Sequence, residues 1–207
     1  MDISVILDIA LHLDTYLFTL IESYGIIIYG ILFLVILCET GLVVTPFLPG
    51  DSLLFAAGTL AAMGMLNIFW VMGIIVVAAI LGDALNYAIG SRCGYYLMRY
   101  PRLLNPKYIA RTRAFYHKHG GKTIVLARFM PIIRTLAPFV AGISRMPYPQ
   151  FFKYNVTGAI LWTGLLSIGG YLFGKIPIVR DNFSLVVIAI IILSIIPLLN
   201  ELRNAHK

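Results

Sequence analysis

Long apolar segments with almost no charge are the feature that most constrains this chain. Ser23–Cys38, Tyr154–Gly174 and Phe183–Leu199 contain no charged residue, and Asn67–Gly90 contains only Asp83. A helix needs about 20 apolar residues to cross the hydrocarbon core of a bilayer. We therefore predict an all-α polytopic membrane protein with about four transmembrane helices, in one membrane domain that covers the whole chain.

The composition excludes several other classes of protein. Of the 207 residues, 60% are apolar and 12% are charged, whereas typical soluble domains have about 45–50% apolar and 25% charged residues. A soluble globular domain, a disordered tail and a disulfide-rich secreted module are thus excluded. The net charge of +7 does not predict nucleic-acid binding, because in so apolar a chain basic residues report membrane orientation.

The basic residues predict which side of the membrane each loop faces. Segment 92–122 contains eight Lys and Arg residues and no acid, so the positive-inside rule predicts that it is cytoplasmic. Counting spans from this segment predicts that both termini are cytoplasmic as well. Residues 1–22 lack the basic start of a secretory signal, and we predict that they form an N-terminal interfacial helix.

Two further apolar stretches, 40–65 and 123–145, contain prolines that break a helix. Backbone groups freed in hydrocarbon cost several kcal/mol each unless protein or water satisfies them. We therefore predict two re-entrant helical hairpins, with kinked full spans as the alternative. Counting spans makes the hairpins enter from opposite faces, the pseudo inverted repeat typical of secondary transporters. The residues expected to shape the hairpins are Pro46, Pro49, Gly50, Pro131, Pro138 and Gly142.

Four charges lie in or beside these hairpins: Glu39, Asp51, Arg128 and Arg134. A central charge costs about 2.5–3.5 kcal/mol on insertion scales, so these side chains must be paired, hydrated or shallow. Two acids from one hairpin and two arginines from the other predict a polar site where the hairpin tips meet. The arginines suit phosphate oxygens, and Glu39 and Asp51 suit proton coupling. The alternative is that the charges only hold the hairpins together.

Other polar residues lie within the predicted spans. Asp83, Asn86 and Tyr87 share one helix face and either pack helices or line a polar path. Asn155 and Trp162 are expected to be packing or interfacial-belt residues. Both cysteines, at positions 38 and 93, are expected to be small buried side chains, and no metal site or cofactor is predicted.

Three segments together resemble the DedA family, which shares the VTT domain with eukaryotic lipid scramblases. They are residues 33–55 (FLVILCETGLVVTPFLPGDSLLF), residues 120–142 (GGKTIVLARFMPIIRTLAPFVAG), and Gly82-Asp83 followed by Asn86-Tyr87. The resemblance implies a polytopic inner-membrane protein with two opposed re-entrant hairpins and lipid translocation that depends on the proton gradient. It also implies that Glu39 and Asp51 match the family's essential acids, and Arg128 and Arg134 its essential arginines.

The expected function is that of a proton-motive-force-dependent flippase of the bacterial inner membrane, recycling undecaprenyl phosphate. Its expected partners are membrane lipids and protons, and the sequence leaves a homo-oligomer open. The alternatives are a phosphatidylethanolamine flippase or scramblase, a proton-coupled transporter of small solutes or cations, and a non-transporting assembly protein. An enzyme is not expected, because the apolar segments contain no histidine or clustered acids to serve as base or metal ligands.

Overall fold

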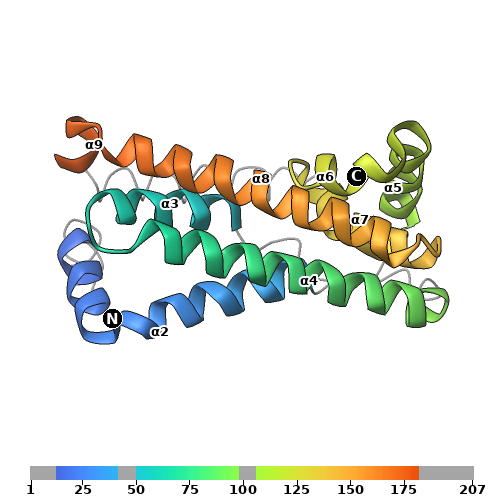
Figure 1. The fold of residues 1–207 in the computed structure, drawn as a ribbon, viewed down its shortest axis with the longest axis horizontal. Helices are drawn as coiled ribbons and strands as arrows, with labels where there is room; N and C mark the ends of the chain where they lie inside the picture. Colours follow the sequence, from blue (N-terminus) through green and yellow to red (C-terminus); the bar gives the residue numbers. More distant parts are fainter. Residues whose placement is uncertain (1–12, 42–49, 98–105, 182–207) are drawn as a thin grey trace. The chain divides into compact units, whose positions relative to one another are not determined.

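All regular structure in the described part of the chain is helical. A computed structural model describes residues 13–41, 50–97 and 106–181 (Figure 1). The elements are α2 (Leu13–Gly41), α3 (Gly50–Ala62), α4 (Ile68–Leu97), α5 (Pro106–His119), the 3-10 turn η1 (Gly120–Lys122), α6 (Thr123–Ala127), α7 (Pro131–Ile143), α8 (Tyr148–Gly174) and α9 (Pro177–Asp181). The predicted all-α class is confirmed for these residues.

Three of these helices are long and apolar enough to cross a membrane. They contain the segments Tyr24–Gly41, Ile68–Gly94 and Tyr148–Gly174. Large apolar side chains such as Ile26, Phe69 and Leu165 are exposed on them, which suits lipid contact and not water. Three of the four predicted spans are thus present as suitable helices, and the fourth, Phe183–Leu199, lies outside the described residues.

The ends of the long helices differ from their predicted positions. In α2 the backbone is kinked at Gly25, where φ is 21° and ψ is −91°. The helix then runs on through Glu39 to Gly41, beyond its predicted end at Cys38, because Glu39 is paired with a cation. Of the predicted interfacial helix, residues 1–12 lie outside the described part, and its place at the interface stays a prediction.

The start of α4 has a local cause that is visible in the sequence. The side-chain Oδ1 of Asn67 accepts hydrogen bonds from the backbone N–H groups of Phe69 (3.0 Å) and Trp70 (3.3 Å). Asparagine in this position satisfies donors that the first turn of a helix leaves without partners. Asn67 therefore fixes the predicted start of this span, whereas the helix continues past its predicted end at Gly90 to Leu97.

The described residues divide into two compact units. The first comprises residues 13–31, 50–72 and 164–181, and the second comprises residues 32–41, 73–97 and 106–163. In the first unit, α3 lies against the C-terminal part of α8 (Figure 1). A Cβ atom on Gly58 would lie 2.2 Å from the carbonyl oxygen of Ser167, and one on Gly170 would lie 2.1 Å from that of Phe55. Small residues thus allow the close helix packing common in membranes.

In the second unit, α4 and α7 pack through glycines in the same way. A Cβ atom on Gly90 would lie 2.2 Å from the carbonyl oxygen of Phe139, and one on Gly142 would lie 2.2 Å from that of Tyr87. Gly142, which was expected to shape a hairpin, therefore serves helix packing. Helix α5 covers α7 with Ile109, which joins Leu136, Phe139 and Val140 in one buried cluster.

Replacing Gly90 with Ala is expected to lower the free energy of unfolding by about 1–3 kcal/mol, because an overpacked backbone contact must open. The matched control is Gly73→Ala on the same helix, where no atom from beyond the adjacent helical backbone lies within 4 Å of the new methyl group among the described residues. That variant is expected to be neutral or slightly more stable, since Ala favours helix. Thermal unfolding in detergent measures both, and equal stabilities would contradict the packing of α4 on α7.

The predicted break within 123–145 is present, with one correction. Helix α6 ends at Ala127 and α7 begins at Pro131, and the two helices contact each other. Pro138, however, lies inside α7 and does not end it, so its predicted helix-breaking role is wrong. The Tyr116 hydroxyl donates to the carbonyl of Ala137 (3.0 Å), and this bond from α5 supports α7 beside the proline.

The first predicted hairpin is described only in part. Pro46 and Pro49 lie outside the described residues, and Gly50 begins the short apolar helix α3. Re-entry of either hairpin into the membrane stays a prediction. Both cysteines, Cys38 and Cys93, are exposed, so their predicted burial is wrong: each lies on an outer face of a long apolar helix, where a small apolar side chain can meet lipid.

Candidate functional site

Two buried ion pairs lie in the second unit. Nη2 of Arg134 donates to Oε1 of Glu39 at 2.6 Å, and Nη2 of Arg128 donates to Oδ2 of Asp83 at 2.5 Å. The four residues are only 3–7% exposed. Their charges sum to zero, so of the three predicted possibilities (paired, hydrated or shallow) the structure shows pairing for Glu39, Arg128 and Arg134.

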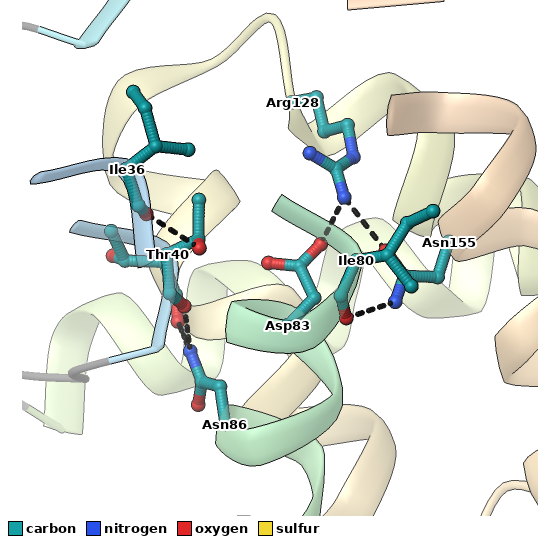
Figure 2. Close-up of polar contacts among 8 residues, drawn as sticks. Ile36, Thr40, Ile80, Asp83, Asn86, Arg128 and Asn155 are labelled. Atoms are coloured by element: carbon teal, nitrogen blue, oxygen red, sulfur yellow. Dashed lines mark hydrogen bonds and ion pairs between the residues drawn. The ribbon is translucent and has the colours of Figure 1, made fainter. Parts of the chain in front are cut away.

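The acid paired with Arg128 differs from the one expected. Asp83, on α4, faces Arg128, which lies just after α6 (Figure 2). The predicted site combined two arginines with Glu39 and Asp51. Asp51 belongs to the other unit, where it lies exposed in the first turn of α3, and its proton-coupling role stays a prediction. The buried cluster therefore consists of Glu39, Asp83, Arg128 and Arg134.

Asn155 fixes the guanidinium of Arg128. Its Oδ1 accepts a second hydrogen bond from Nη2 of Arg128 at 2.7 Å, while its Nδ2 donates to the carbonyl of Ile80 at 3.0 Å (Figure 2). The bond to Ile80 on α4 orients the amide so that its oxygen points to the arginine. Asn155 is fully buried. Three parts of the chain therefore meet at this ion pair: α4 supplies Asp83, the end of α6 supplies Arg128, and α8 supplies Asn155.

Trp162 connects the two pairs. The guanidinium carbon of Arg134 lies 4.5 Å from the centre of its ring, and that of Arg128 lies 5.9 Å from it. Both distances fall in the range of cation–π attraction. Since Trp162 is only 1% exposed, it is not a residue of the interfacial belt, and one aromatic ring attracts both cations of the cluster.

Asn86 braces the Glu39–Arg134 pair through the backbone. Its Nδ2 donates to the carbonyl of Thr40 (3.2 Å) and to that of Thr135 (2.7 Å). These residues directly follow Glu39 and Arg134 in the sequence. Asn86 thus joins the end of α2 to α7, and Figure 2 shows its amide reaching Thr40. The shared face predicted for Asp83 and Asn86 is therefore directed into the buried cluster.

Tyr87 and Tyr116 make hydrogen bonds to the backbone that stabilise the helices around the buried cluster. The Tyr87 hydroxyl donates to the carbonyl of Met146, and its ring stacks on Phe151 with 4.5 Å between centres. Burial, with a smaller effect from the negative charge of Asp83, raises the pKa of the Tyr116 phenol above its ordinary value. Tyr116 therefore remains protonated and keeps its bond to α7 throughout the physiological range.

The sequence indicated some of these residues and not others. Asn155 and Trp162 were expected only to pack or to lie in the belt, although a polar amide within a long apolar run was a usable signal. Asp83 was visible as the only charge in its segment, but its partner lies 45 positions away in the chain. Among the described residues, no three His, Cys, Asp or Glu side chains gather as a metal site would require.

The arrangement suits reversible binding of an anion. An arginine fork binds carboxylate and phosphate oxygens with similar geometry, so an entering phosphate can replace a paired carboxylate. A carboxyl group can also take up a proton and give up its arginine. Nε of Arg128 is buried and has no hydrogen-bond partner among the residues described, which leaves this guanidinium a donor for another acceptor.

Known proteins match almost the entire chain. The VTT domain matches residues 48–172. Protein DedA of Escherichia coli K12 is 50% identical over 206 residues, covering 98% of this chain and 94% of that protein. A membrane protein of Mycobacterium leprae is 40% identical over 175 residues, covering 84% and 78%. The inner membrane protein YghB of E. coli K12 is 33% identical over 171 residues, covering 82% and 78%.

No solved structure gives a significant match. The sequence matches are nevertheless extensive, because the VTT domain alone accounts for more than half of the residues. The names of these relatives describe membrane and inner membrane proteins, in agreement with the three described helices that are long enough to span a membrane. The chain therefore belongs to the DedA family of membrane proteins.

Proposed function

We propose that the chain is a lipid translocase of the bacterial inner membrane that uses the proton motive force and moves undecaprenyl phosphate between leaflets. Arg128 and Arg134 bind the phosphate, and Glu39 and Asp51 couple protonation to transport. The observation that carries the proposal is the burial of two arginines, each paired with a carboxylate, in segments flanked by helices long enough to span. Ionisable residues so placed usually mark a substrate path or proton relay.

Proton coupling follows because the carboxylate of Glu39 and the phosphate of a lipid compete for the same N–H donors of Arg134. In the paired state, the carboxylate of Glu39 occupies Nη2 of Arg134. Protonation of Glu39 removes the negative charge, while arginine keeps its positive charge at any physiological pH. The guanidinium then binds the phosphate of a lipid, and loss of the proton favours release. Proton uptake on one side and loss on the other would thus drive the phosphate across.

The remaining features of the proposal concern the whole protein. The proline-broken segments 40–65 and 123–145 form re-entrant hairpins from opposite faces, and both termini are cytoplasmic. The protein acts on lipids and protons without chemical conversion, so it is not an enzyme. The two hairpin segments form a pseudo inverted repeat, an arrangement in which substrate sites lie near the bilayer midplane.

Proteoliposomes containing labelled undecaprenyl phosphate and a pH gradient test the proposal. Arg128→Lys and Arg134→Lys keep the charge and lose the planar fork, and each is expected to reduce the initial transport rate at least about tenfold, equivalent to ~1.4 kcal/mol. The matched control is Arg92→Lys, which makes the same change at an exposed residue of α4. Wild-type rates in both site variants, or transport that persists without a pH gradient, would refute the proposal.

A second candidate is phosphatidylethanolamine flipping. The cluster holds equal numbers of acids and arginines, which also suits a zwitterion, with phosphate on an arginine and ammonium on a carboxylate. Competition in the same vesicles separates the candidates. If unlabelled phosphatidylethanolamine suppresses undecaprenyl phosphate transport in proportion to its concentration, the second candidate is favoured.

A further inference from the structure

The side chain of Arg128 is held by contacts with α4 and α8. Its Nη2 donates to Asp83 of α4 and to Asn155 of α8. A Cβ atom on Gly158 of α8 would lie 3.0 Å from both Cδ and Nε of Arg128, so the missing side chain of Gly158 makes room for the arginine. The space beside Gly158 thus suits this side chain, and Asp83 supplies its ion pair among the residues that the structure describes.

The two ion pairs are braced in different ways. Asn86 holds the backbone beside both Glu39 and Arg134, so that pair is fixed through the main chain. Asn155 instead binds the guanidinium of Arg128 itself. If Asp83 released Arg128, Asn155 and the space beside Gly158 would therefore still keep the guanidinium in place.

The donors of Arg128 are not all used. Its Nε is buried without a hydrogen-bond partner among the residues described, although a buried donor normally has one. Nη2 is shared between a carboxylate and an amide. Release of Asp83 would leave Nη2 and Nε available for the two oxygens of a bidentate anion.

From these contacts we infer that Asp83 is the resident anion of a phosphate site on Arg128, held there by Asn155, and that a phosphate group binds by displacing the Asp83 carboxylate. The exchange breaks and forms hydrogen bonds only. Asp83 and Asn155 are therefore positioning residues for Arg128. The inference rests on the proposed function in taking phosphate as the ligand, and it adds the competing acid, which lies outside both proline-broken segments.

Trp162 provides a direct signal for this exchange. The chain has two tryptophans, and the other, Trp70, is 67% exposed and belongs to the other unit. In a Trp70→Phe background, fluorescence reports only on Trp162, whose ring lies 5.9 Å from the guanidinium carbon of Arg128. Titration of the purified full-length protein with inorganic phosphate, and separately with short-chain phosphatidic acid, then measures binding.

In this background, Asp83→Ala is expected to bind both probes about tenfold more tightly than the parent, because the resident anion is gone and its space is open. Asp83→Asn removes the charge but fills the space, so a smaller gain is expected. Phosphate is also expected to raise the melting temperature of Asp83→Ala by more than that of the parent. Glu22→Gln, in the other unit, controls for the change in net charge.

Three results would overturn the inference. One is unchanged phosphate affinity in Asp83→Ala, and another is a gain for phosphatidic acid without one for inorganic phosphate. The third is failure of Asp83→Ala to fold even when it is purified in phosphate, since phosphate would then not replace the carboxylate. If phosphate affinity rose in Glu39→Ala but not in Asp83→Ala, this inference would be refuted and the proposed function would stand. If phosphate affinity rose in neither variant, both would be refuted.

Discussion

Replacing Arg134 with Met is expected to lower the free energy of unfolding by about 3–5 kcal/mol, because it removes the cation that neutralises the buried charge of Glu39. Glu39 is 4% exposed and accepts its bond from Nη2 of Arg134 at 2.6 Å. Such a loss is a large share of the ~5–15 kcal/mol that stabilises a typical protein. The measurement is reversible unfolding in detergent, followed by circular dichroism.

A double-mutant cycle separates the ion pair from simple loss of packing. Glu39→Met alone is expected to destabilise by a similar amount, since it removes the carboxylate that neutralises the buried charge of Arg134. The double variant Glu39→Met/Arg134→Met is expected to recover most of the loss, because a buried pair can often be exchanged for apolar residues without cost.

Lys153→Met is the matched control for the loss of a positive charge, since Lys153 is exposed on α8. It is expected to stay within about 0.5 kcal/mol of wild type. If the two single changes at the pair simply added up in the double variant, Glu39 and Arg134 would not be energetically coupled, and the buried pair would be refuted.

Replacing Trp162 with Ala is expected to destabilise the protein by about 3–5 kcal/mol through lost packing alone. Trp162 is among the largest fully buried side chains, and it also lies beside both guanidinium groups. Trp70→Ala is the matched control, because Trp70 is exposed and is expected to change the free energy of unfolding much less. Equal losses at both positions would contradict the burial of Trp162.

Two further substitutions isolate the attraction between the ring and the arginines. Trp162→Phe keeps an aromatic face, whereas Trp162→Leu offers a side chain of comparable bulk without one. Phe is expected to be the more stable by about 0.5–2 kcal/mol, the range of cation–π attraction. The difference should vanish when both variants are made in an Arg128→Met/Arg134→Met background, and its persistence there would show that the arginines are not its cause.

The sequence was sufficient for features that depend on local chemistry. The length of apolar segments predicted the long helices, the prolines predicted the break before α7, and Asn67 marked the start of α4. The cost of a charge in an apolar setting predicted that the arginines would be paired, hydrated or shallow, and the structure shows that they are paired. Family resemblance identified Glu39, Arg128 and Arg134, which the structure places in one buried cluster.

Features that depend on tertiary packing could not be predicted in this way. Pairing of Arg128 with Asp83 depends on how the segment that follows α6 packs against α4, and a single sequence does not specify this packing. Trp162 resembles a belt residue because its position in an apolar run is the same whether it faces lipid or the interior. Pro138 was expected to break α7, and the neighbouring bond from Tyr116 could not be seen from local sequence.

The chain order of the paired charges has a consequence for biosynthesis. Synthesis proceeds from the N-terminus, so Glu39 and Asp83 are made before Arg128 and Arg134. Before its arginine partner has been synthesised, a carboxyl group can be neutral in the membrane by taking up a proton, whereas an arginine side chain stays charged. The residues that can become neutral are thus synthesised first, and each arginine is synthesised after the acid with which it pairs. A nascent chain with the order of the charges reversed would expose unpaired arginines to lipid.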